Sequence, residues 1–215
     1  MMRILVFCIF LPLVTNAEPA SFNCKKTITT VENIICTDSH LSFLDNLLSR
    51  YYKQSIDIST NSQSIKDSQR QWLKEIRNKC LDIVCLKSAY NERLAILKTI
   101  LLSKMANNAD FTGIYESKNG ELLIEKLPGR KIKFDLFVFG PYDKNKSFSP
   151  KSNQIDGEIF LVGDTATYNE DGDCNAILIF LNNSIHVIEY GCWIYAISAT
   201  GNYKLKSKNI GLIHK

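Results

Sequence analysis

The cysteines are the residues whose spacing most clearly indicates a chemistry. The chain has seven of them. Six fall into three pairs that are close in the sequence: Cys24 with Cys36, Cys80 with Cys85, and Cys174 with Cys192. An even set of cysteines behind an export signal is typical of a disulfide framework. The spacing therefore predicts structural disulfides in an oxidising compartment, and it argues against metal or redox catalysis by these thiols.

The N-terminus has the order of a secretory signal peptide. A basic start at Arg3 precedes an apolar run of 11 residues over 4–14, and Thr15-Asn16-Ala17 follows. This order predicts cleavage after Ala17. The run is too short to cross a bilayer, which needs about 20 residues. Cys8 lies within the leader and is removed with it, so we expect an unlipidated protein that is periplasmic or secreted.

The charge of the chain is too small to favour nucleic acid as a partner. It carries 26 basic and 22 acidic residues, a formal net charge of +4. The basic excess lies in residues 18–108, with 13 basic and 9 acidic side chains, whereas residues 109–215 have 12 and 13. A strong basic surface is the usual mark of nucleic-acid binding, and this composition does not supply one.

The composition changes near residue 107 and indicates two domains. The preceding stretch 27–106 contains no glycine, and all ten glycines follow it. We predict an α+β protein, in which a disulfide-stapled antiparallel helical domain precedes an antiparallel β-barrel or curved sheet. The predicted boundaries are a leader at 1–17, a helical domain at 18–106, a linker at 107–110 and a β domain at 111–215.

Apolar residues in the first half recur at steps of three and four. Three such stripes run from Leu41 to Tyr52, from Ile65 to Cys80, and from Leu86 to Leu101. They predict three long helices, which short connections would make antiparallel. We expect a short helix over 31–36 before them, with Thr37 or Asp38 capping the first long helix.

The second half alternates with period two and predicts eight strands joined by turns. Regular strands at this spacing favour a meander that closes into a small barrel or forms a curved sheet. The expected strands are 112–116, 122–125, 132–139, 157–162, 165–168, 176–181, 185–190 and 203–205.

The last cysteine pair can be tested against the register of one hairpin. With Asn182-Asn183-Ser184 as the loop, Cys174 lies directly opposite Cys192 and shares a face with Ile188 and Tyr190. Directly opposed strand residues have Cα atoms about 4.5–5.5 Å apart, which falls within the disulfide range of about 4.4–6.8 Å. We therefore predict this bridge.

The four N-terminal cysteines permit three connectivities. Local pairing joins Cys24 to Cys36 and Cys80 to Cys85, which ties the entry segment to the short helix and pins the turn at 81–84. Crossed pairing joins Cys24 to Cys85 and Cys36 to Cys80. We prefer the local scheme, and the crossed scheme remains open at this point.

Several residues of the helical half follow one another in an order that resembles a known family. They include the four cysteines, the pair Leu44-Asp45, the run Gln69-Arg70-Gln71-Trp72-Leu73, and Tyr90 and Arg93-Leu94 further on. Over residues 22–97 the chain resembles the LprI-type lysozyme-inhibitor domain, which is found in exported bacterial proteins. The resemblance implies an envelope protein and, for the namesake at least, inhibition of lysozyme. It supplies no catalytic motif, and it does not cover the β domain.

Two aromatic residues are candidates for contact with a partner. Trp72 could be an exposed anchor, since Trp and Tyr are favoured at interface hot spots, or it could pack between helices. Tyr203 ends Thr200-Gly201-Asn202-Tyr203, which is similar to a Ser-Gly-x-x-Tyr loop of another class of lysozyme inhibitor, offset by one residue. Asp45 is expected to form an ion pair with Arg70 or Arg77.

No residues combine into a catalytic, metal-binding or cofactor-binding motif. His40, His186 and His214 are the only histidines, and none stands at a metal-ligand spacing. Neither a phosphate-binding loop nor a nucleophile elbow is present. We therefore predict that the protein is not an enzyme and that it uses no metal or cofactor.

Two functions remain. The leading hypothesis is an exported non-catalytic binding protein, a periplasmic lysozyme inhibitor with a protein partner and no stable membrane insertion. The alternative is a structural or interaction protein of the envelope, whose helical domain docks a protein and whose β domain binds a small ligand or a subunit. Charge argues against the first, because animal lysozymes are cationic and an electrostatically steered inhibitor is expected to be acidic.

Overall fold

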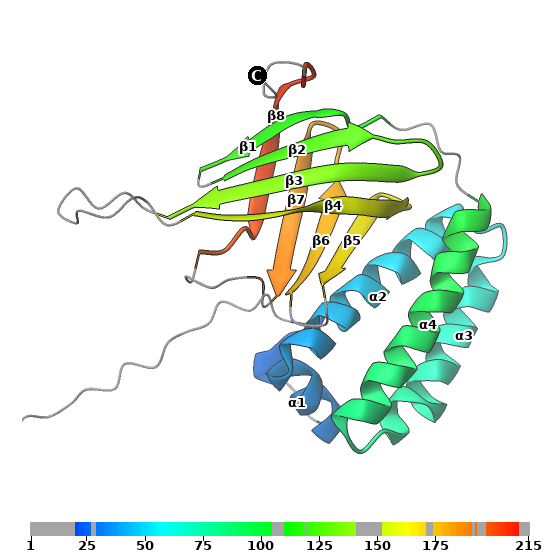
Figure 1. The fold of residues 1–215 in the computed structure, drawn as a ribbon. Helices are drawn as coiled ribbons and strands as arrows, with labels where there is room; N and C mark the ends of the chain where they lie inside the picture. Colours follow the sequence, from blue (N-terminus) through cyan, green and yellow to red (C-terminus); the bar gives the residue numbers. More distant parts are fainter. Residues whose placement is uncertain are drawn as a thin grey trace, which may run out of the picture.

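The computed structural model describes residues 20–26, 29–104, 110–118, 120–140, 152–170, 174–190, 192 and 197–210. Figure 1 shows a barrel of strands packed against a layer of helices. The predicted leader and its cleavage site, residues 107–109 of the predicted linker, and His214 lie outside the described residues.

The helical half contains the short helix and the three long helices that were predicted. The short 3-10 turns η1 and η2 cover Cys24–Lys26 and Arg77–Lys79, and the helices are α1 Thr30–Thr37, α2 Ser39–Ile58, α3 Ser62–Glu75 and α4 Ile83–Lys104. Asp38 caps α2 as expected, because its Oδ1 accepts a hydrogen bond of 2.8 Å from the Leu41 amide. None of the helices described combines the length and apolarity that a bilayer span requires.

The second half is a closed eight-stranded barrel. Its strands are β1 Gly113–Ser117, β2 Gly120–Lys126, β3 Lys131–Phe139, β4 Ser152–Val162, β5 Thr165–Glu170, β6 Cys174–Phe180, β7 Ser184–Tyr190 and β8 Gly201–Ser207. Each strand pairs antiparallel with its neighbour in sequence, and β1 pairs with β8 to close the ring. The predicted α+β class and the closing meander are confirmed.

Side chains fill the interior of the barrel. An eight-stranded barrel is just wide enough for its own side chains, and the residues that point inward form one buried cluster. The most deeply buried members include Leu122, Ile124, Phe134, Leu136, Ala176, Leu178, Ile185, Val187 and Tyr203. The barrel is therefore a solid core built from alternating inward positions.

A second apolar core joins the outside of the barrel to helix α2. The outward residues Ile177 and Ile179 of β6 and Ile188 and Tyr190 of β7 belong to the same buried cluster as the helical residues. The ring of Phe43 meets Tyr190 edge to face at a centroid distance of 5.3 Å. Figure 1 shows α2 lying between the barrel and the other two long helices.

Polar contacts continue along the same stripe of α2. Asn46 donates to the Tyr190 hydroxyl at 3.0 Å, and one turn later Arg50 donates to Thr165 Oγ1 at 2.8 Å and forms an ion pair with Asp164. Steps of three and four place successive residues on one helix face, so this face of α2 is committed to the barrel.

The β6–β7 hairpin differs from the prediction by one residue of register. Leu181 donates its amide to the Ser184 carbonyl at 2.9 Å, so the loop is the two residues Asn182-Asn183 and not three. Phe180 then faces Ile185, and Ile177 faces Ile188. Because a shift of one residue moves a strand's side chains to the other face, Ile188 and Tyr190 lie outside against α2 and do not share a face with Ala176 and Leu178 of β6, which point into the barrel.

All three disulfides join the sequence-local pairs. Cys24 is bonded to Cys36, Cys80 to Cys85, and Cys174 to Cys192. The crossed scheme for the first four cysteines is therefore not the one adopted. Cys174 and Cys192 are not directly opposite in the shorter hairpin, but Cys192 follows the end of β7 and its Cα still lies 4.1 Å from that of Cys174.

Asp45 does not make the predicted ion pair. Its carboxylate is buried, 4% exposed, and accepts hydrogen bonds from the Ser21 amide at 2.8 Å, the Ser21 hydroxyl at 2.6 Å and the Tyr90 hydroxyl at 2.7 Å. Arg70 pairs with Asp67 on its own helix instead. Burial, reinforced by the Asp45 charge, raises the pKa of the Tyr90 hydroxyl far above its ordinary value. Asp45 thus ties the entry segment and α4 to α2.

We expect Asp45→Asn to destabilise the protein by about 3 kcal/mol, because the change removes charge-assisted bonds and leaves buried donors poorly paired. Urea unfolding at neutral pH measures the effect. Asp67→Asn on the exposed face of α3 is the matched control and should stay within about 0.5 kcal/mol. Equal effects of the two changes would contradict the structural role of Asp45.

Glu189 should make stability depend on pH. Burial raises its pKa from 4.5 to about 7, although hydrogen bonds from the Ser198 hydroxyl and the Cys192 amide favour the charged form. The folded state therefore holds this proton more tightly than the unfolded chain. Its stabilising contribution is complete below the ordinary pKa and is lost as the pH rises through the folded-state value.

Glu189→Gln should remove this part of the pH dependence of stability. Compared with the wild type at the same pH, the variant should be more stable at pH 8 than it is at pH 4. Thermal melts of both proteins across that range are the measurement. Parallel curves for variant and wild type would rule out the titration of Glu189.

Candidate protein-binding site

The two residues predicted to contact a partner are both buried. Trp72 is 6% exposed and packs edge to face on Tyr90 at 5.4 Å between centroids. Tyr203 is 1% exposed, and its hydroxyl donates to the Ala199 carbonyl at 3.0 Å inside the barrel. Neither ring is presented to a partner in this structure, and for Trp72 the burial favours packing between helices over the role of an exposed anchor.

The histidines do not form part of a metal site in the described residues. His186 Nδ1 lies 2.8 Å from Asn202 Oδ1 at the barrel surface. Partial burial, together with the nearby Lys87, lowers the pKa of His40. Within the same residues, no group of three or more His, Cys, Asp or Glu side chains could hold a metal ion.

A polar pocket of about 370 Å³ lies between α2 and the barrel. Arg50 and Asp164 are among its lining residues, and they are bonded to each other. The Gln54 side chain also accepts from the Asp164 amide at 3.1 Å and donates to Thr165 Oγ1 at 3.3 Å. These groups satisfy one another, so the pocket is explained by the joint between the two halves.

The turn between α3 and α4 is different, because it is rigid and faces solvent. We call residues 76–85 the stapled tip. The Cys80–Cys85 disulfide closes it, with Cα atoms 5.4 Å apart. Asp82 Oδ1 accepts from the Cys85 amide at 2.8 Å, and the Asp82 carbonyl accepts from Leu86 at 3.2 Å, which fixes the start of α4.

Large apolar side chains project from the stapled tip. Leu81 is 89% exposed and Val84 is 79% exposed, and they are flanked by Ile76 and Ile83, which are nearly half exposed. Figure 1 shows this end of the α3–α4 hairpin pointing away from the barrel. Four apolar residues held outward on a closed turn form a protruding surface suited to a partner's hollow.

A shallow groove of about 430 Å³ runs beside the stapled tip. Its floor includes the Cys80–Cys85 bridge and Ala89, and charged side chains stand at its edge. The full lining is Glu75, Ile76, Lys79, Cys80, Cys85, Ser88, Ala89 and Glu92. An apolar centre with a polar rim is the usual composition of a protein interface.

The stapled tip was not recognised as a binding surface from the sequence, in which residues 81–84 served only as a helix connection. One signal could have shown it. Leu81, Ile83 and Val84 fill a turn between two cysteines, where turns ordinarily carry Gly, Pro, Asn, Asp or Ser. Apolar residues in a turn that a disulfide keeps in place are unfavourable in water unless something covers them.

Leu81→Asp should leave the stability of the isolated protein unchanged within about 0.5 kcal/mol, because the side chain contributes little to the core. Leu86→Asp, five residues further along and 0% exposed, should unfold the helical half. Urea unfolding of the two variants tests this contrast. A large loss of stability for Leu81→Asp would mean that the stapled tip is packed in solution.

Comparison with known families agrees with the resemblance in the sequence. Residues 23–110 match the family described as "Lysozyme inhibitor LprI". The match covers the helical half and its stapled tip, and it ends where the barrel begins. No curated protein and no solved structure matches the chain.

Proposed function

We propose that this is an exported, non-catalytic protein that binds a lysozyme and inhibits it through the stapled tip. The match of residues 23–110 to the lysozyme inhibitor family is the observation that carries the proposal. The geometry adds a surface of the right kind within that same region, since Leu81 and Val84 project from a turn with little freedom to lose.

Insertion of the stapled tip into the substrate cleft accounts for inhibition without chemistry. A lysozyme cleft is long and open, and an apolar projection seated in it excludes the polysaccharide. Covering a Leu or Val side chain contributes roughly 1.5–3 kcal/mol. The disulfide orders the turn beforehand, so little of that energy is lost to ordering on binding.

This mode also answers the objection from charge. The helical half is net basic, which opposes attraction to a cationic enzyme. The free energy gained by burying apolar side chains does not depend on the sign of the net charge, so tight binding would come from slow dissociation and not from fast association. We therefore expect inhibition by the stapled tip to change little, or to improve, as salt screens the repulsion.

The alternative function, an envelope interaction protein, could use the same stapled tip for a different protein partner. Its second element, a small apolar ligand inside the barrel, is opposed by the dense packing of the inward side chains. The barrel is better suited to hold the helical half in position, because its outer face is part of the same core as α2.

The oxidised mature chain should inhibit hen-type or goose-type lysozyme in a cell-wall turnover assay. The double change Leu81→Asp with Val84→Asp should weaken inhibition by about 100-fold, because two exposed apolar contacts are replaced by charges that are costly to bury. Ile96→Asp is the matched control. Ile96 is also an exposed apolar residue of α4, 53% exposed, but it lies about 18 Å along the helix from Val84 and should have no effect.

The outcomes separate the parts of this proposal. Failure of the wild-type chain to slow either enzyme at micromolar excess would remove lysozyme as the target. Inhibition that persists in the double variant would keep the target and move the contact elsewhere.

A further inference from the structure

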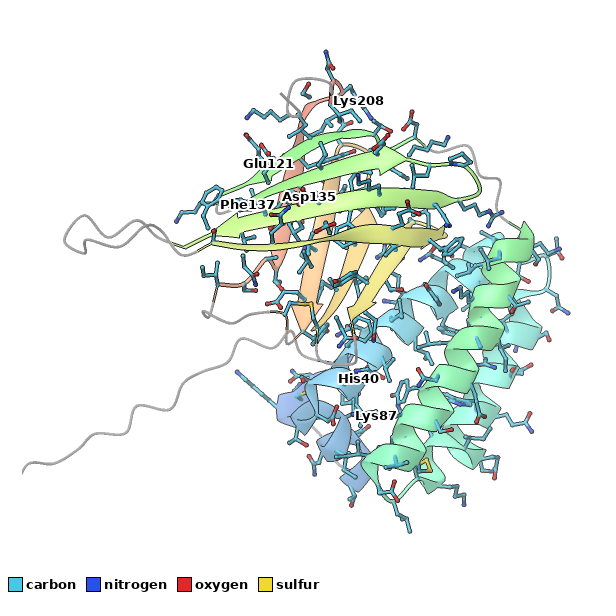
Figure 2. All side chains as sticks on the ribbon, in the orientation of Figure 1. His40, Lys87, Glu121, Asp135, Phe137 and Lys208 are labelled. Carbon is cyan, nitrogen blue, oxygen red and sulfur yellow. A yellow bond between two sulfur atoms is a disulfide. The ribbon has the colours of Figure 1, made fainter. Side chains whose placement is uncertain are left out.

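A pair of phenylalanine rings lies exposed on the barrel, on the side remote from α3 and α4. Phe137 and Phe139 occupy successive outward positions of β3, 38% and 40% exposed, with ring centroids 6.0 Å apart. Figure 2 shows Phe137 on this part of the barrel, near Glu121 and Asp135. Outward positions of a sheet are ordinarily polar, so two aromatic residues in succession there require an explanation.

Carboxylates lie beside the Phe137 ring. The register places Glu121 of β2 directly opposite Phe137, and Asp135 shares the outward face of β3 two residues earlier. Across the next pair of strands, Asp156 of β4 is directly opposite Asp135. We call these five residues, Glu121, Asp135, Phe137, Phe139 and Asp156, the carboxylate–aromatic face.

The arrangement of these charges is unfavourable for the folded protein alone. Asp135 faces Asp156 across β3 and β4, and Glu121 faces Glu116 across β2 and β1. Like charges directly opposed on a sheet destabilise it. Lys206 pairs with Glu116 and also acts on Glu121, and Lys204 lies directly opposite Glu116, so the unfavourable pair that remains is Asp135 with Asp156. Gln154 donates to both oxygens of Asp135 at 2.9 and 3.0 Å. The cross-strand neighbours of Asp135 are Leu123 and Asp156, so the ladder sets no cation opposite it.

At the other end of the same strands, opposite charges face each other. There Lys133 faces Glu125 on one side and Glu158 on the other, and Lys131 is paired with Glu158 at 3.4 Å. Phe160, 52% exposed, has the Lys131 ammonium 5.5 Å from its ring centroid. Along β3 and β4 the lysines thus lie at the Phe160 end, whereas Asp135, Asp156 and the rings of Phe137 and Phe139 lie toward the other end.

We infer that the carboxylate–aromatic face is a docking surface for the basic surface of a partner protein. Lysine and arginine side chains pair with carboxylates and also stack on aromatic rings, so a cationic surface suits every group on this face. The aromatic pair supplies the apolar centre that such an interface needs. This inference does not depend on lysozyme inhibition, because the stapled tip lies in the helical half and none of its residues is involved.

The test uses the oxidised mature chain immobilised at low ionic strength, with two cationic proteins of unrelated fold as probes: hen-type lysozyme and cytochrome c. The variants are Phe137→Ser with Phe139→Ser, and Asp135→Asn with Asp156→Asn. Each pair should weaken binding of both probes by about 10-fold, and the acidic pair should also slow association and reduce the dependence on salt.

Matched controls lie at the Phe160 end of these strands. Phe160→Ser removes an even more exposed ring, and Glu158→Gln removes an exposed carboxylate, and both should leave binding within about twofold. Asp156→Asn alone should raise the melting temperature of the free protein, because it relieves the opposed pair.

The inference is overturned if neither cationic protein binds, or if the face variants bind them as the wild type does. Loss of both probes in the face variants, with the controls unchanged, supports it. Inhibition of lysozyme is measured separately, with the double variant of the stapled tip, Leu81→Asp with Val84→Asp. If that variant loses inhibition but still binds cytochrome c, the result bears on the proposed function and not on the carboxylate–aromatic face.

Discussion

The architecture depends on helix α2 being buried from two sides. One stripe, which includes Asn46 and Arg50, contacts the outer face of the barrel, whereas Asp45 and its neighbours face α4 through Tyr90. A helix covered on both sides cannot shift toward one partner without opening a gap against the other, and close-packed interiors do not tolerate such gaps. The barrel and the helical hairpin are therefore held as one body, which explains how the turn between α3 and α4 can be projected away from the barrel.

The residues that carry the family resemblance serve this framework. Asp45, Trp72, Tyr90 and Arg93 are all buried, and Arg93 reaches Gln69 at 2.8 Å while Trp72 lies on Tyr90. They hold helices together and leave the surface to other side chains. A sequence match that rests on such buried residues is good evidence for a shared helical framework. Contact with a target depends instead on exposed positions such as Leu81, whose residue type is not fixed by core packing.

Most of the fold could be predicted from the sequence, because helices and strands with one buried face have a clear period. The four helices, the eight strands and the local disulfides follow from apolar spacing, turn residues and cysteine positions. The register of β6 and β7 could not, because Ile177 to Phe180 are apolar on both faces and two different cores compete for them. Whether Trp72 and Tyr203 are buried or exposed could not be decided from the sequence for a related reason: a large aromatic residue indicates burial or contact with a partner until its neighbours are known. The exposure of Leu81 and of Phe137 likewise could not be predicted from the sequence and becomes visible only in the structure.

Closure of the barrel has a consequence for how this protein can be recognised. The ring is closed, but its ladder is shortest between β4 and β5, where only Leu161 with Ala166 and Val162 with Thr165 are paired. Strand addition by another chain requires a sheet edge without a partner strand, so within the described strands the stretch of β4 before Leu161 is the place where it could occur. Along the fully paired strands a partner meets side chains, and specificity held in side chains can be changed by a few substitutions at no cost to the hydrogen-bonded ladder.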